Sequence, residues 1–244
     1  MPPPVAVVSD IHANLPALQA VLADMAAFAP ATIYNLGDTV GYGPDPEASV
    51  DWAREHAAVS LMGNHDAACV GQLGLEWFNP WAREAVEWTF ARLGSDRRRW
   101  LAARPSTYRL VLGGLRILLA HGTPRHPVTE YISGDAAAQL LRDQDPGWDV
   151  CLVGHTHLMG VYTRSGYRPL FESTEIPLVT PCIVNAGSVG QPRDGRPEAG
   201  YVLVDADGGR LVVRRVAYAV QVTQQAILDA GLPSILAERL AVGR

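Results

Sequence analysis

The stretch Val59-Ser-Leu-Met-Gly-Asn-His-Asp66 places three polar side chains directly after an apolar run. The run, residues 58–62, has the length and composition of a buried strand. Asn64 and His65 pack poorly against apolar neighbours, so each needs a polar partner wherever it is buried. We therefore expect a strand that ends in a polar site.

Two earlier stretches end in the same way. The apolar run 4–9 stops at Asp10-Ile-His12, and the run 32–36 stops at Gly37-Asp38. In open α/β sheets, ligands bind at the carboxyl ends of strands, so the three polar tips are expected to converge. Apolar residues at helical spacing predict helices after the first two strands, at 17–29 and 47–56.

The second half of the chain is predicted to be mainly β. Gly113-Gly114 separates two strand-like runs and is a strong signal for a two-residue hairpin. Another strand opens into Gly154-His-Thr-His157. The expected strands are 108–112, 115–120, 149–153, 160–163, 168–171, 183–186, 201–205 and 210–216, with helices at 134–142 and after residue 221.

Residues 71–105 are rich in aromatic side chains and are predicted to form a pair of helices. Asn79-Pro80 suits the cap and first residue of a helix over 81–93. Aromatic residues at helical spacing usually pack in a core, and the alternative is a helical cap inserted over the site. We treat 1–244 as a single domain with a C-terminal helical tail at 219–244, built from two mixed sheets with helices outside.

Composition excludes several classes of protein. Hydrophobic residues make up 48% and charged residues 18% of the 244, which is typical of a globular protein rather than a disordered or fibrous one. A formal charge of -5 and a pI near 5.8 exclude the broad basic surface that extended nucleic-acid binding requires.

Three cysteines, at 69, 151 and 182, are odd in number and widely spaced. They predict small buried apolar side chains rather than a disulfide framework or a thiolate metal site. The first strand begins within a few residues of Met1, and no apolar run approaches about 18 residues. We therefore expect a cytoplasmic protein that does not bind membranes.

Eight polar side chains recur at the predicted strand ends, in the order Asp-x-His, Gly-Asp, Gly-Asn-His-Asp, His and Gly-His-x-His. A His-x-His pair by itself is as often structural as metal-binding, but the whole series predicts a metal site. Carboxylate, amide and imidazole ligands without a thiolate favour Mn, Fe, Zn, Ni or Co over calcium or an iron-sulfur cluster. The eight residues are Asp10, His12, Asp38, Asn64, His65, His121, His155 and His157.

Seven of these side chains can ligate a metal, which is more than one tetrahedral ion needs. Two ions about 3.5–4 Å apart that share one carboxylate would use all seven. Such a pair generates hydroxide and clamps phosphoryl oxygens during in-line displacement. The ligand count therefore predicts a dinuclear centre for phosphoester chemistry.

The five motifs resemble those of the calcineurin-like metallophosphoesterases. The resemblance implies an α/β (α+β) fold, a four-layer αββα sandwich of two mixed sheets, and a dinuclear centre in which Mn is expected first. It implies that Asp38 bridges the two ions. It further implies that Asp10, His12 and His157 hold one metal and that Asn64, His121 and His155 hold the other.

The same resemblance places His65 outside the metal ligands, near the leaving-group oxygen. There an imidazolium could donate a proton or offset developing negative charge. Asp66 is the second catalytic candidate, and it either orients His65 or serves as a local cap. Protein serine/threonine phosphatases of the family carry Asp-Arg-Gly after the Gly-Asp motif, whereas this chain has Gly41-Tyr-Gly, which disfavours a protein substrate.

Longer stretches resemble a bacterial branch described as phosphodiesterase-like or related to diadenosine tetraphosphatases. The loop Asn185–Gly190 and Arg193 could approach an anion, and the alternative is a tight turn with a solvated arginine. The substrate-binding candidates are Tyr42, Asn79, His126, Ser188 and Arg193. The stretches that carry the resemblance are 41–46, 78–80, 121–124, 130–131 and 185–194.

These features predict a metal-dependent hydrolase that cleaves a small phosphoester, most simply a phosphodiester or nucleotide. One alternative is hydrolysis of dinucleoside polyphosphates, which would need additional arginine contacts. The other is a non-catalytic scaffold or binding protein that retains the fold. The expected partner is the small substrate alone, with a homodimer as the alternative to a monomer.

Overall fold

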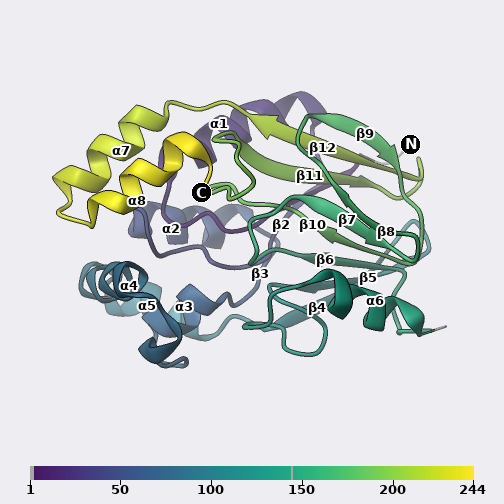
Figure 1. Ribbon diagram of the computed structural model, residues 1–244, viewed down its shortest axis with the longest axis horizontal. Coiled ribbons are helices and arrows are strands. Elements are labelled where there is room, and N and C mark those ends of the chain that lie inside the picture. Colours follow the sequence, from purple (N-terminus) through teal and green to yellow (C-terminus); the bar gives the residue numbers. More distant parts are fainter. Residues whose placement is uncertain (1–2, 144) are drawn as a thin grey trace.

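The computed structural model describes residues 3–143 and 145–244, and within them two six-stranded sheets pack face to face with helices on both outer sides (Figure 1). The expected four-layer sandwich of two mixed sheets is confirmed. The first sheet has the order β3 (Val59–Ser60), β2 (Thr32–Asn35), β1 (Val5–Val8), β11 (Ala199–Asp205), β12 (Arg210–Val216) and β9 (Thr174–Pro177). The second has the order β4 (Thr107–Leu112), β5 (Leu115–Ala120), β6 (Val150–Val153), β10 (Cys182–Asn185), β7 (Gly160–Thr163) and β8 (Gly166–Pro169).

Both sheets combine parallel and antiparallel pairs. In the first, β1, β2 and β3 are parallel, while β11, β12 and β9 run antiparallel to their neighbours. In the second, β5, β6 and β10 are parallel. Because the parallel strands of each sheet end at one edge, the polar residues that follow them are brought together.

Helices cover the outer faces and one end of the sandwich. Helix α1 packs on β11 and β12, and α6 packs on β7 and β8. No helix of the described residues is long and apolar enough to cross a membrane. The α-helices are α1 (Leu15–Met25), α2 (Pro46–His56), α3 (Asn64–Cys69), α4 (Pro80–Arg92), α5 (Ser95–Ala102), α6 (Gly134–Arg142), α7 (Val220–Asp229) and α8 (Ser234–Glu238), and the last is followed by a 3₁₀ turn, Arg239–Val242.

Strand β1 shows why the sequences of the parallel strands are continuous apolar runs. Its side chains alternate between faces, so Val5 and Val7 enter the core between the sheets. Ala6 and Val8 point the other way and pack under α1. Since both faces are covered, all four residues are buried, and no polar residue is tolerated before Ser9.

Several element boundaries differ from the predicted ones. Strand β3 pairs over two residues only, because Met62 donates its N–H to the carbonyl of Pro105 instead of continuing the ladder. The strand predicted at 168–171 lies at 166–169, where a tight turn pairs Thr163 with Gly166. Strand β9 was not predicted, because its four residues lack a clear apolar alternation.

The aromatic residues of 71–105 divide into two groups. Trp88 and Trp100 pack against apolar clusters, as predicted, whereas Trp77 is 71% exposed and Trp81 is 49% exposed. Trp88 also donates its indole N–H to the carbonyl of Ala230, 3.1 Å away. Helix α4 is thereby joined to the C-terminal helices, which gather with it at the left end of the molecule in Figure 1.

The three cysteines are buried and free, as predicted. Burial raises the pKa of Cys69 and of Cys182 to about 12. Their thiols are therefore protonated and unreactive at neutral pH.

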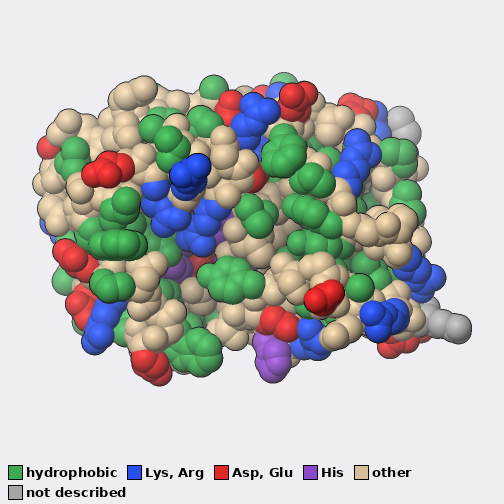
Figure 2. Space-filling model, in the orientation of Figure 1, with side chains coloured by type: hydrophobic (Ala, Val, Ile, Leu, Met, Phe, Trp, Pro, Cys, Tyr) green, Lys and Arg blue, Asp and Glu red, His purple; other side chains and the backbone are tan. Residues whose placement is uncertain are grey.

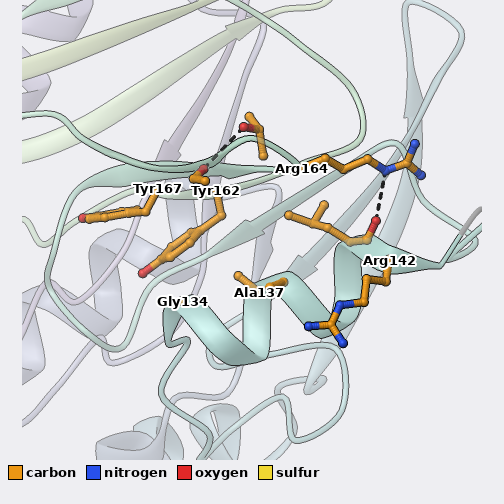
Figure 3. Close-up of a pocket in the computed structure, with 10 residues that line it drawn as sticks. Gly134, Ala137, Arg142, Tyr162, Arg164 and Tyr167 are labelled. Carbon is orange, nitrogen blue, oxygen red and sulfur yellow. Dashed lines mark hydrogen bonds between the residues drawn. The ribbon is translucent and has the colours of Figure 1, made fainter.

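A cavity of about 530 Å³ lies between α6 and the β7–β8 hairpin (Figure 3). Tyr162 and Tyr167 stack on its wall with ring centroids 4.4 Å apart. Arg164 donates to the carbonyls of Leu141 and Asp143, at 3.0 and 3.1 Å, and so satisfies the last carbonyls of α6. This arginine fastens the hairpin to the helix, and none of the eight predicted site residues lines the cavity.

Candidate metal centre

The predicted ligands sit where the backbone turns sharply after a strand. Five of them have positive φ angles, in the left-handed region that residues with a side chain seldom adopt, at a cost of about 1–2 kcal/mol each. Such conformations persist where the surrounding structure holds them and cluster at functional sites. They are Asp10 (54°), His12 (48°), Asp38 (51°), His155 (65°) and His157 (60°).

Steric crowding explains why the Gly-Asn-His-Asp motif begins with a glycine. A Cβ on Gly63 would lie 2.1 Å from Oδ1 of Asp38. A glycine is therefore required at position 63 for the polar residues after β3 to lie beside Asp38, which follows β2.

The first ligand group consists of Asp10, His12 and His157. The Nε2 atoms of the two histidines are 3.2 Å apart, and Oδ1 of Asp10 lies 3.1 Å from Nε2 of His157. Each histidine directs its Nδ1 to a carbonyl, His12 to Val40 and His157 to Gln191. Because Nδ1 then carries the proton, both Nε2 lone pairs face the same point, as in a metal site.

The second ligand group consists of Asn64, His121 and His155. Nε2 of His121 lies 3.2 Å from Oδ1 of Asn64, and its Nδ1 donates to the carbonyl of Leu36. His155 has the opposite arrangement, because its Nε2 contacts the carbonyl of Thr129 and its Nδ1 is left for a ligand.

Asp38 stands between the two groups. Its Oδ2 is 3.6 Å from Nε2 of His12 and 3.4 Å from Nε2 of His121. Its Oδ1 accepts the N–H of His65 at 2.8 Å, which holds the carboxylate in this orientation. Metal-ligating atoms of the two groups come together around this shared residue, the first with Asp10, His12 and His157 and the second with His121 and His155.

The buried carboxylates of Asp10 and Asp38 are stabilised by positive charge on their neighbours. Burial raises the pKa of Asp10 and of Asp38, but the surrounding histidines outweigh it and hold both carboxyls below their ordinary pKa. Burial likewise lowers the pKa of His121, and the two carboxylates outweigh it and raise the pKa to about 9. Burial lowers the pKa of His155 to about 3. A proton on His121 thus balances part of the carboxylate charge, and a cation can replace it.

Oδ1 of Asp10 gives a second sign that a cation fits. It is buried without a hydrogen-bond donor among the described residues, although a buried carboxylate oxygen normally has one. Oδ2 of the same group accepts from Ser9 Oγ at 2.6 Å and from the N–H of His155 at 3.0 Å. The carboxylate is therefore oriented by two donors and leaves one oxygen for a metal.

His65 lies beside the first ligand group. Its ring makes edge contacts with His12 and Phe78, with centroids 4.9 Å away in both cases, and packs 4.3 Å from Tyr42. Its Nδ1 is buried next to Gly41 with no hydrogen-bond partner in the part of the chain that the structure describes. Burial lowers the pKa of His65 to about 4, so the ring is neutral at pH 7.

Among the residues that the structure describes, Asp66 accepts side-chain hydrogen bonds from backbone N–H groups only. Its carboxylate accepts N–H groups of Thr39, Val40 and Gly63 at 3.1–3.2 Å. Burial, together with the charge of Asp38, raises its pKa to about 7. The geometry favours the cap over the orientation of His65, since Asp66 closes the first turn of α3 and anchors the loop after β2.

The five substrate-binding candidates occupy different environments. Tyr42 is buried beside His12 and His65, and Arg193 donates to its hydroxyl at 3.3 Å. Ser188 donates to the carbonyl of Asp10 and accepts the N–H of Gln191, both at 2.8 Å, so its hydroxyl supports the metal-ligand loop. Asn79 caps α4, and His126 is exposed on a loop.

Sequence reasoning did not find the groups that orient the ligands. Four of them are the backbone carbonyls of residues 36, 40, 129 and 191, which have no sequence signature. Ser9 follows an apolar run and precedes Asp10, and that adjacency is the one signal that could have identified it.

Comparison with known proteins places this geometry in context. Residues 4–209 match the model of the calcineurin-like phosphoesterase superfamily domain. An uncharacterized protein of Methanocaldococcus jannaschii is 34% identical over 242 residues, which cover 98% of each chain. The crystal structure of a metallophosphoesterase from Sphaerobacter thermophilus superposes with a TM-score of 0.86 at 37% identity over the full length of both chains. A protein of Pyrococcus horikoshii shares the fold, with a TM-score of 0.80 at 21% identity over 99% of this chain and 98% of its own.

Proposed function

Since the chain belongs to the calcineurin-like phosphoesterase superfamily and is a phosphoric ester hydrolase, we propose that it uses two metal ions to cleave a small phosphodiester or nucleotide. The observation that carries the proposal is the position of Asp38 Oδ2, between Nε2 of His12 and Nε2 of His121. A carboxylate oxygen placed between two imidazole lone pairs suits a bridge between two ions.

The residues would divide between the ions as the two ligand groups do. Asp10, His12 and His157 would hold one, Asn64, His121 and His155 the other, and Asp38 both. Oxygen and nitrogen ligands without sulfur suit Mn first, with Fe, Zn, Ni or Co as alternatives. When bound, the ions would supply the Lewis acidity that activates water and withdraws charge from the phosphoryl group.

The remaining side chains position and neutralise the substrate. His65, neutral at rest, offers Nε2 toward the leaving-group oxygen, and the charge of an arriving phosphoryl group would raise its pKa and favour proton donation. Tyr42 and Phe78 pack against the His65 ring and hold its orientation. Arg193 contributes positive charge at the edge of the site.

Steady-state hydrolysis of p-nitrophenyl phosphate and bis-p-nitrophenyl phosphate, with MnCl₂ present, tests the proposal. We expect turnover of both, with a larger kcat/KM for the diester, and about two metal ions per chain by elemental analysis. Protein treated with a chelator should lose activity and regain it when metal returns. A metal-loaded protein that hydrolyses neither compound would contradict the proposal.

A further inference from the structure

Two arginines from distant parts of the chain meet at Tyr42. The guanidinium carbons of Arg193 and Arg239 lie 5.7 and 6.0 Å from the centre of the Tyr42 ring. The same ring packs 4.3 Å from His65 and 4.7 Å from His12. Tyr42 therefore contacts the candidate metal centre and also two positive charges.

Arg239 is brought there by the packing of the C-terminal helices. It begins the 3₁₀ turn after α8, and Leu236 and Leu240 on either side of it are buried in one cluster with Tyr42. Arg193 comes from the loop between β10 and β11, where its N–H donates to the carbonyl of His157. The backbone of Arg239 is thus placed by buried neighbours and that of Arg193 by a hydrogen bond.

Neither guanidinium has an Asp or Glu partner within residues 3–143 and 145–244. Arg193 donates to the neutral amide oxygen of Gln191 at 2.9 Å, and Arg239 donates through Nε to the backbone oxygen of Arg244. By contrast, Arg214 and Arg215 pair with aspartates. Burial, and then the charge of Arg193, lowers the pKa of Arg239, as expected for two half-buried cations that lie close together.

The molecular surface near the two arginines is also positively charged. In Figure 2, arginine side chains gather near the C-terminal end of the chain, around an opening in which histidine side chains are visible. Two half-buried cations repel each other, and an anion between them would remove that cost. Their planar guanidinium groups match phosphate oxygens in a bidentate geometry.

We propose that Arg193 and Arg239 together bind a second phosphate of the substrate, so that the enzyme prefers nucleotides with two or more linked phosphates to those with one. The proposal rests on the proposed function, because it assumes that the first phosphate lies at the candidate metal centre. It makes Arg239 a specificity-determining residue and the C-terminal segment part of the substrate site.

Competition and direct binding with ADP and AMP test this assignment. Each nucleotide, with MnCl₂ in excess, is titrated by calorimetry into the wild-type protein and is used to inhibit hydrolysis of bis-p-nitrophenyl phosphate. We expect ADP to bind at least tenfold more tightly than AMP. Arg239→Gln should reduce that ratio about tenfold, the usual effect of losing a charge-assisted hydrogen bond, and Arg239→Lys should retain part of it.

Arg196→Gln is the matched control, because it removes an equal charge from the neighbouring loop where Arg196 faces Glu172. It should keep the wild-type ratio. Equal binding of ADP and AMP by the wild-type protein, or an equal loss in Arg196→Gln, would overturn the proposal while leaving the hydrolase assignment intact. Selective ADP binding through Arg239 in a protein that hydrolysed no phosphoester would support this site and refute the proposed function.

Discussion

One carboxylate connects the two ligand groups. Asp38 uses Oδ1 to accept the N–H of His65 and presents Oδ2 to His12 and His121. The position of Gly63-Asn-His-Asp66 depends on Asp38. Oδ1 of Asp38 holds the backbone of that motif, while Oδ2 faces both ligand groups.

Replacement of the shared carboxylate should affect both metals. In Asp38→Ala we expect metal content to fall at both positions, since each group loses a ligand and the charge that attracts the cation. Elemental analysis after gel filtration measures this. His65→Ala is the comparison and should retain its metal, so equal metal loss in the two variants would contradict the assigned roles.

His65 should act on turnover rather than on metal binding. We expect His65→Ala to lower kcat for an alkyl phosphodiester about 10²- to 10⁴-fold, the usual contribution of a general acid. The decrease should be smaller for bis-p-nitrophenyl phosphate, because p-nitrophenolate leaves without protonation. Parallel kcat measurements on the two substrates provide the test, and an equal loss on both would rule out proton donation to the leaving group.

At the scale of elements, a polar contact fastens α1 to the outer face of the first sheet. Asp24 of α1 accepts two hydrogen bonds from Arg214 of β12, at 2.6 and 2.9 Å, and one from the Tyr201 hydroxyl of β11 at 2.8 Å. The hydrogen bonds from Arg214, more than the single one from Tyr201, lower the pKa of Asp24. Since α1 follows the loop that carries Asp10 and His12, this contact helps to hold that loop in place.

The Asp24 contact should make stability depend on pH. A carboxyl whose folded-state pKa is lowered stabilises the protein above its unfolded-state pKa, about 4, and loses that contribution as pH falls through the folded-state value. We expect Asp24→Asn to reduce the free energy of unfolding by about 1–2 kcal/mol at pH 7 and by less below pH 4. Urea unfolding at both pH values measures it.

Glu87→Gln is the control for Asp24→Asn. Glu87 pairs with Arg83 on the exposed face of α4, so its replacement should change stability little at either pH. A difference between wild type and Asp24→Asn that stayed constant down to pH 3 would contradict the electrostatic explanation.

At the scale of the whole molecule, the C-terminal helices and α4 close one side of the site. Leu236 is buried with Tyr42, Ala82 and Ala85, and so joins the end of the chain to the loop after β2 and to α4. The N-terminal and C-terminal parts of the chain are therefore stabilised by the same cluster.

This shared cluster makes a remote leucine important for stability. Leu236→Ala should lower the free energy of unfolding by about 2–5 kcal/mol, because it removes buried methyl groups and leaves a cavity. Leu228→Ala, at a position 47% exposed, should have a much smaller effect. Urea unfolding of the two variants compares them, and equal effects would show that the C-terminal helices are not part of the cooperative core.

Sequence reasoning was most successful where local pattern and burial agree. The apolar runs before Asp10 and Asp38 identified β1 and β2, because parallel strands covered on both faces cannot carry polar residues. It failed for β9, which depends on pairing with the distant strand β12, and for the end of β3, which depends on a carbonyl 43 residues away. It also missed the limits of β8, which are set by the tight turn that joins it to β7. For 71–105, helical spacing predicted the helices but not which tryptophans would be exposed.

By itself, the sequence determined the two-sheet fold and the identity of the polar residues at the strand ends, because apolar periodicity and polar breaks are local properties. Only the tertiary structure decided that Asp38 Oδ2 lies between His12 and His121, that His155 has the opposite ring orientation to the other three ligand histidines, and that Arg239 reaches Tyr42. These results depend on backbone carbonyls and on contacts between segments up to about 200 residues apart, and chain periodicity carries no information about either.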